Sequence, residues 1–199
     1  MTALCVRVGP PDGVLTALEE GVRAHLELDV HAAADAARAL ELIEGSAADP
    51  LLLIAHGHPP SHEGFPDLRC DGGFFASGRV ARAMRGRALL VFACWSATLP
   101  TRWQLRPRAY VGFEGWLLVG RAADRAPIVR ELFEPVGRAL VGSLSLQDLH
   151  AAWQIAATRA FADHPATPAG SVLPEMLAHN ARAARVAPRG VADVWLTRA

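Results

Sequence analysis

The sequence has no lysine, few cysteines and no excess of either charge. Its 20 basic residues are all arginine, so a phosphate-binding P-loop, which needs a lysine, is excluded. The three cysteines are scattered and odd in number, which argues against the disulfide framework of a secreted domain and favours a reducing compartment. Because 20 acidic residues balance the arginines, no basic excess is present and no nucleic-acid partner is expected.

Long hydrophobic runs are also missing. No segment stays apolar for the roughly 20 residues that span a bilayer. The N-terminus lacks the charged start and apolar core of a signal peptide. We therefore expect a cytoplasmic protein without a membrane segment. The chain of 199 residues is expected to form a single domain over residues 1–199.

Short apolar runs alternate with amphipathic segments along the chain. The runs predict strands near residues 3–8, 26–30, 51–55, 88–93, 110–119 and 191–196. The segments between them predict helices near residues 13–24, 33–43, 76–85, 127–141 and 145–162, the first capped by Asp12 and the fourth interrupted by Pro135. Residues 58–73 predict a loop with a short hairpin. This order predicts an α/β fold with a mainly parallel sheet of about six strands flanked by helices.

Two of the predicted strands end on residues that can carry out chemistry. The run at 51–55 leads into His56 and Gly57, and the run at 89–93 leads into Cys94. The carboxyl ends of parallel strands meet at one edge of a sheet, and the separation of 94 − 56 = 38 residues leaves room for a helical crossover. An imidazole beside a thiol can accept its proton and free the nucleophilic thiolate. The alternative is that Cys94 is an ordinary buried cysteine.

The histidine-rich loop offers a competing interpretation. His56, His58 and His62, with Cys70 and Asp71 downstream, contain the residue types that bind zinc. No His-Glu-x-x-His helix and no Cys-x-x-Cys pair supports this interpretation. The nucleophile elbow of α/β-hydrolases, Gly-x-Ser-x-Gly, is missing as well. We therefore expect no metal and no cofactor, and we interpret the loop residues as polar neighbours of an active site.

A possible substrate pocket follows the nucleophile strand. Glu114 interrupts an apolar segment between two glycines, and Phe113 and Trp116 flank it. This segment, together with Asp71, is either a solvated turn or the wall of a pocket. If Glu114 faces the cleft, its carboxylate would hold an arginine or lysine of the substrate. The competing interpretation is that Phe113 and Trp116 line an apolar pocket and that Glu114 pairs with an arginine of the protein.

Two short motifs resemble those of a known enzyme family. Ala-His-Gly at residues 55–57, followed by Ala-Cys-Trp-Ser-Ala at residues 93–97, resembles the caspase-like cysteine peptidases, above all the bacterial CHAT branch. The order of predicted elements over residues 1–160 is also similar to that family. The resemblance implies a cysteine endopeptidase in which Cys94 is the nucleophile and His56 the general base and acid. It further implies that the backbone N–H groups of Gly57 and Cys94 stabilise the oxyanion.

The chain departs from the family pattern in ways that affect its partners. The Gln-Ala-Cys-Arg-Gly motif of caspases is absent, and Phe92-Ala93 precedes Cys94 where many metacaspases have an aspartate. A basic substrate preference therefore cannot be transferred. The resemblance implies a protein or peptide substrate. CHAT enzymes are often fused to helical repeats, and none is found here, so we expect a separate regulatory protein, as in a bacterial antiviral defence or cell-death system. Two alternatives stay open: an inactive caspase-like binding module, and an α/β protein that binds a metal or a small molecule.

Overall fold

A computed structural model describes residues 2–58, 67–70, 73–74, 77–102, 104–120, 125–163, 172–187 and 196. In chain order, the elements are β1 Leu4–Val8, α1 Gly13–Leu26, β2 Val30–Ala33, α2 Ala36–Glu44, β3 Leu51–His58, β4 Asp67–Cys70, β5 Gly73–Phe74, α3 Ser77–Ala83, β6 Ala88–Phe92, η1 Ser96–Thr98, α4 Leu99–Arg102, β7 Ala109–Phe113, α5 Arg125–Leu140, α6 Leu146–Asp163, α7 Leu173–Ala183 and β8 Ala184–Ala187.

The strands form one sheet whose main path has the order β2-β1-β3-β6-β7-β8. All neighbours on this path are parallel except β7 and β8, which are antiparallel. The hairpin of β4 and β5 extends from the end of β3, where β4 pairs antiparallel to it. The predicted α/β fold with a mainly parallel sheet of six strands is confirmed.

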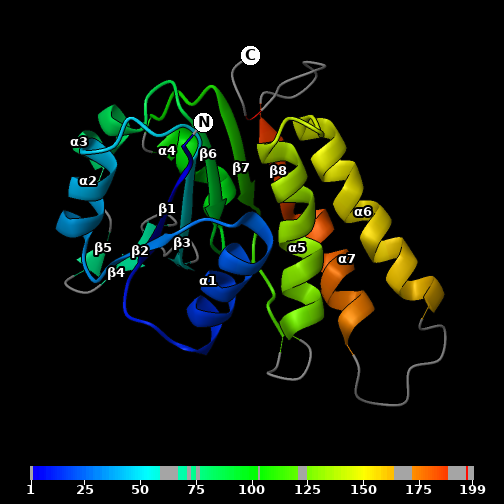
Figure 1. Cartoon of the computed structure of the whole chain (residues 1–199). Coiled ribbons are helices and arrows are strands. Elements are labelled where there is room, and N and C mark those ends of the chain that lie inside the picture. The colour runs from blue at the N-terminus through cyan, green and yellow to red at the C-terminus, as the bar shows by residue number, and fades with distance from the viewer. Residues whose placement is uncertain are drawn as a thin grey trace.

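Helices cover both faces of the sheet (Figure 1). Leu52 and Ile54 of β3 belong to a core shared with α1, α5, α6 and α7. Leu51 and Leu53, which alternate with them, belong to a second core shared with α2 and α3. Strands buried on both faces need continuous apolar sequence, and this is why the runs of β3 and β6 were recognisable. Their carboxyl ends are thereby held rigidly at one edge.

Polar side chains set the starts of several helices. The Asp12 carboxylate accepts hydrogen bonds from the Val14 and Leu15 N–H groups at the start of α1. Asp35 caps α2 in the same way by accepting from the Arg38 N–H. Such caps satisfy backbone donors that have no partner inside the helix.

Several predicted boundaries need correction. The strand expected at 26–30 is instead the end of α1 and a loop, because the apolar face of that helix continues to Leu26, and β2 begins only at Val30. The strand expected over 110–119 ends at Phe113, and Gly115 then turns the chain with a φ of 94°. The region between the helix predicted to end near residue 162 and the strand predicted at 191–196, where no element was predicted, contains α7 and β8. Residues 191–195 lie outside the described part, and Leu196 is buried.

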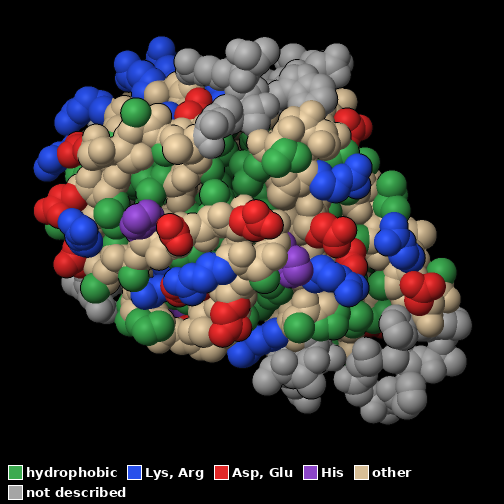
Figure 2. All heavy atoms as spheres, in the orientation of Figure 1, with side chains coloured by type: hydrophobic (Ala, Val, Ile, Leu, Met, Phe, Trp, Pro, Cys, Tyr) green, Lys and Arg blue, Asp and Glu red, His purple; other side chains and the backbone are tan. Residues whose placement is uncertain are grey.

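The surface carries charges of both signs. Figure 2 shows acidic and basic side chains interspersed on the face it presents. In the described ranges, none of the helices has the length and apolar character needed to cross a membrane. Among its described residues, the face shown therefore has no patch of a single charge that would suggest a binding surface.

Candidate active site

His56 and Cys94 lie at the same edge of the sheet, at the carboxyl ends of the neighbouring strands β3 and β6. β3 and β6 are parallel, and their register pairs Ile54 with Phe92, an offset of 92 − 54 = 38 residues. The same offset leads from His56 to Cys94. Ile54 and Phe92 face the core beneath α1 and α5, and Cys94 packs against that core. Because side chains alternate between faces and adjacent strands lie about 4.8 Å apart, we expect the His56 and Cys94 side chains to project from the same face of this edge.

Gly57 brings the two strand ends into direct backbone contact. A Cβ atom at this position would lie 1.6 Å from the Cys94 carbonyl oxygen and 2.6 Å from the Cys94 carbonyl carbon. No side chain fits that space, so glycine is required for sterics alone. The predicted role of the Gly57 and Cys94 N–H groups toward an oxyanion stays a prediction.

A buried serine fixes the turn that follows Cys94. The Ser96 hydroxyl lies 3.0 Å from the Val91 carbonyl oxygen and 2.8 Å from that of Ala93, and it accepts from the Phe113 N–H at 2.9 Å. The Tyr110 hydroxyl donates to the Ser96 carbonyl oxygen at 2.6 Å. These bonds tie the exit of β6 to β7. The position of the thiol is therefore set by the core and not by a free loop.

The Cys94 sulfur is half-buried and has a backbone donor beside it. The Leu117 N–H donates to Sγ over 3.3 Å. Burial raises the pKa of the Cys94 thiol above its ordinary value, while the N–H groups of Leu117 and of Cys94 itself act in the opposite direction. At neutral pH the resting side chain is therefore a thiol, and it needs a base before it can act as a nucleophile.

That protonation state gives a pH prediction. Alkylation of Cys94 by iodoacetamide should accelerate about tenfold per pH unit between pH 7 and pH 9, because only the thiolate reacts and a raised pKa keeps its fraction below saturation. Mass spectrometry of the peptide containing Cys94 would measure the rate. Cys5 has no exposed surface and should remain unmodified. A plateau below pH 7 would show instead that a thiolate–imidazolium pair already exists at rest.

Asp12 is a member of the site that sequence reasoning missed. Its second carboxylate oxygen lies 2.5 Å from the His56 Nε2 atom, while the first caps α1. Desolvation opposes ionisation, but hydrogen bonds from the Leu15 N–H, from His56 and from the Val14 N–H lower the pKa of the Asp12 carboxyl below its ordinary value. A carboxylate only accepts hydrogen bonds, so the His56 hydrogen resides on Nε2. In the neutral ring, Nδ1 is then the atom free to accept a proton.

The predicted pocket residues lie in different environments. The Glu114 carboxylate binds the Arg185 guanidinium of β8, as the competing interpretation expected, so it is already neutralised. Phe113 has no exposed surface and packs against Phe92 and Trp153 in the core. Trp116 is 56% exposed beside the site. The predicted pocket residue Asp71 lies outside the described residues.

The zinc interpretation gains no support from the described part of the chain. Among those residues, no three His, Cys, Asp or Glu side chains gather into a group that could hold a metal ion. His62 lies outside that part, and only the backbone of Cys70 is described. His58 ends β3 two residues beyond His56.

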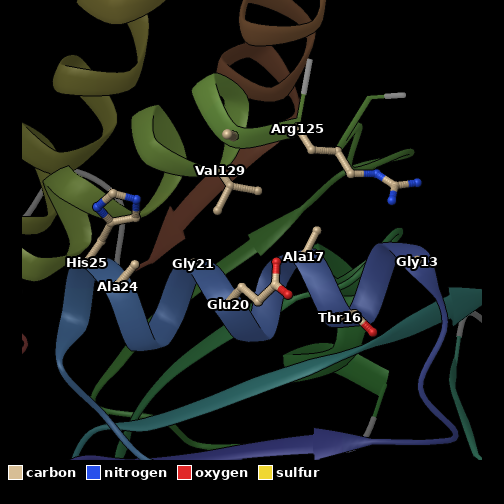
Figure 3. Close-up of a pocket in the computed structure, with 10 residues that line it drawn as sticks. Gly13, Thr16, Ala17, Glu20, Gly21, Ala24, His25, Arg125 and Val129 are labelled. Carbon is tan, nitrogen blue, oxygen red and sulfur yellow. The ribbon is translucent and has the colours of Figure 1, made fainter. Parts of the chain in front are cut away.

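A groove of about 480 Å³ runs along α1 where it faces the start of α5. Figure 3 shows Gly13 at one end of this groove and His25 at the other, with Arg125 and Val129 opposite. Its Gly13 end adjoins Asp12 in sequence, but His56 and Cys94 are not among its lining residues. The groove is thus a neighbour of the candidate site and not part of it.

Comparison with known proteins leaves the family open. No protein-family model matches the chain, and no curated protein matches it either. The resemblance to caspase-like peptidases therefore rests on the two motifs and the order of elements.

Proposed function

We propose that this protein is a cysteine endopeptidase of the caspase-like type, with Cys94 as the nucleophile and His56 as the general base. One observation carries the proposal: His56 and Cys94 lie at the shared carboxyl edge of the adjacent parallel strands β3 and β6, and Asp12 is hydrogen-bonded to the His56 imidazole. From this placement we infer the order carboxylate, imidazole, nucleophile, which activates serine and cysteine side chains on unrelated folds.

The proposed reaction begins with transfer of the Cys94 proton to His56 Nδ1. The sulfur attacks the carbonyl carbon of the scissile peptide bond, and the oxygen takes up the negative charge, which backbone N–H groups at Gly57 and Cys94 would stabilise. The C–N bond then breaks as the imidazolium returns the proton to the leaving amine. Water, deprotonated by His56, hydrolyses the thioester and regenerates the thiol. Asp12 holds the imidazole in the required tautomer throughout.

Labelling with an irreversible, cysteine-directed peptide probe tests the proposal. The wild-type chain should be labelled once, and Cys94→Ala should lose both labelling and proteolysis, since no sulfur remains to form the acyl-enzyme. Cys5→Ala and Cys70→Ala serve as controls and should retain both. Labelling that persists in Cys94→Ala and disappears in Cys70→Ala would identify Cys70 as the nucleophile in place of Cys94. A wild-type chain that neither reacts nor cleaves would favour the inactive binding module.

The cellular setting follows from the family resemblance. We propose a cytoplasmic peptidase whose activity is controlled by a separate protein in a bacterial defence or cell-death system. Comparison of probe labelling in purified protein and in intact producing cells would reveal such a regulator.

A further inference from the structure

Two tryptophans adjoin the candidate nucleophile. Trp95 follows Cys94 directly, and its backbone N–H donates to the Gly115 carbonyl oxygen at 2.7 Å. Trp116 comes next, before Leu117, whose N–H donates to the Cys94 sulfur. The two loops are therefore joined on both sides of Trp116. The backbone of Trp116 is thus held beside Cys94.

The two indole rings meet edge to face and form an apolar corner. Their centroids are 4.2 Å apart and their planes meet at 69°, the edge-to-face arrangement that aromatic pairs prefer. Trp116 is nevertheless 56% exposed, so the pair is not completed by the protein's own core. A large apolar ring left open beside a candidate nucleophile is placed to meet a ligand.

The backbone around this corner is held firmly. Trp95 has a positive φ of 51°, a conformation that costs energy in a residue with a side chain. His179 of α7 contacts the Trp116 carbonyl oxygen through Nε2 at 2.9 Å. The Asn180 side chain binds both the N–H and the carbonyl oxygen of Leu118, at 2.8 and 2.7 Å. A surface fixed before binding loses little conformational freedom when a ligand arrives.

The charge beside the corner is already neutralised. Glu114 is the nearest acidic residue in sequence, and its carboxylate is paired with Arg185. A basic side chain of a substrate would have to compete with that pair. An apolar side chain gains the indole surfaces without such competition.

We propose that Trp95 and Trp116 form the subsite for a large apolar or aromatic side chain, at the substrate residue whose carbonyl carbon Cys94 attacks. This inference rests on the proposed peptidase function and adds the substrate class. Leucine, methionine, phenylalanine and tyrosine fit this chemistry. Binding buries the exposed face of the Trp116 ring together with the substrate side chain.

Fluorogenic tripeptides that differ only at the residue before the scissile bond provide the first test. For the wild type, kcat/KM with phenylalanine or leucine at that position should exceed the value with alanine about 10- to 100-fold. Trp116→Ala should reduce that ratio to near one, while Trp116→Phe should retain most of it. Phe161→Ala removes an aromatic ring of similar exposure, 45%, from α6 and should leave the ratio unchanged. A preference for arginine or lysine that Glu114→Gln abolishes would overturn the subsite.

Alkylation of Cys94 gives a second test that needs no peptide cleavage. The rate with N-benzyl iodoacetamide should exceed that with iodoacetamide about tenfold in the wild type, since the benzyl group occupies the corner. Trp116→Ala should lose this difference. If peptides are not cleaved but the tryptophan-dependent difference is present, the peptidase function fails and the subsite stands. If the rate ratio is the same in Trp116→Ala as in the wild type, the subsite is wrong whatever the peptides show.

Discussion

Asp12→Asn is expected to lower kcat/KM about 1,000-fold. This substitution separates two roles of the Asp12 carboxylate, which caps α1 and holds the His56 ring. Asparagine caps helices as well as aspartate does, so its oxygen keeps the Val14 and Leu15 N–H groups satisfied. Its NH2 group then faces His56 Nε2 and donates to it. This forces the ring hydrogen onto Nδ1, the atom that accepts the Cys94 proton in the proposed reaction. Peptide hydrolysis at saturating and subsaturating substrate would measure the loss.

Asp12→Ser distinguishes the tautomer effect from the loss of a helix cap. Serine also caps the helix, but its single hydroxyl cannot reach the imidazole, so the expected loss is smaller, about 10- to 100-fold. The 15N chemical shifts of His56 should show the hydrogen on Nε2 in the wild type and on Nδ1 in Asp12→Asn. Asp35→Asn, at the cap of α2, is the matched control and should change neither activity nor shifts. Equal activities with aspartate, asparagine and serine at position 12 would show that Asp12 only caps α1 and has no role in catalysis.

Gly57→Ala is expected to abolish activity and to destabilise the fold by about 3 kcal/mol or more. The added methyl group would lie 1.6 Å from the Cys94 carbonyl oxygen, which is backbone and cannot rotate away. Relief requires the ends of β3 and β6 to separate, and this moves His56 away from Cys94. Urea denaturation and peptide hydrolysis would measure the two losses.

Gly86→Ala is the matched control for that substitution. Gly86 has a positive φ of 73°, but a Cβ atom there has nothing within 4 Å. Its cost is therefore backbone strain alone, about 1 kcal/mol, and activity should persist. If Gly57→Ala is as mild as Gly86→Ala, the contact between the strand ends does not hold the site together.

The parts of the site that the sequence could predict depend on continuous apolar runs. The runs before His56 and Cys94 are unmistakable because β3 and β6 are buried on both faces. Once both are placed in a parallel sheet, the shared edge follows. The fold class was predictable for the same reason, since the alternation of such runs with amphipathic helices allows few architectures.

The missed parts depend on which elements become neighbours. Asp12 was recognisable as a helix cap, but its second oxygen meets a histidine 44 residues away only because β1 lies beside β3. β8 is short and contains Arg185, so its sequence lacks the apolar run that marks a strand. It forms a strand because it pairs with β7. The ring contact between Trp95 and Trp116 likewise spans two loops that no local pattern connects.

The hydrogen bonds from α7 to the segment after β7 also bear on how the protein is made. Chains are synthesised from the N-terminus, and domains fold as their segments emerge. His179 and Asn180 therefore reach the Trp116–Leu118 segment only after about 60 further residues have followed it out of the ribosome, since their contacts span 63 and 62 residues. Until then, the segment that supplies the Leu117 N–H to the sulfur lacks these supports. A nascent chain can thus bury its strands early, while the segment around the Cys94 thiol takes its final arrangement only after α7 has been synthesised.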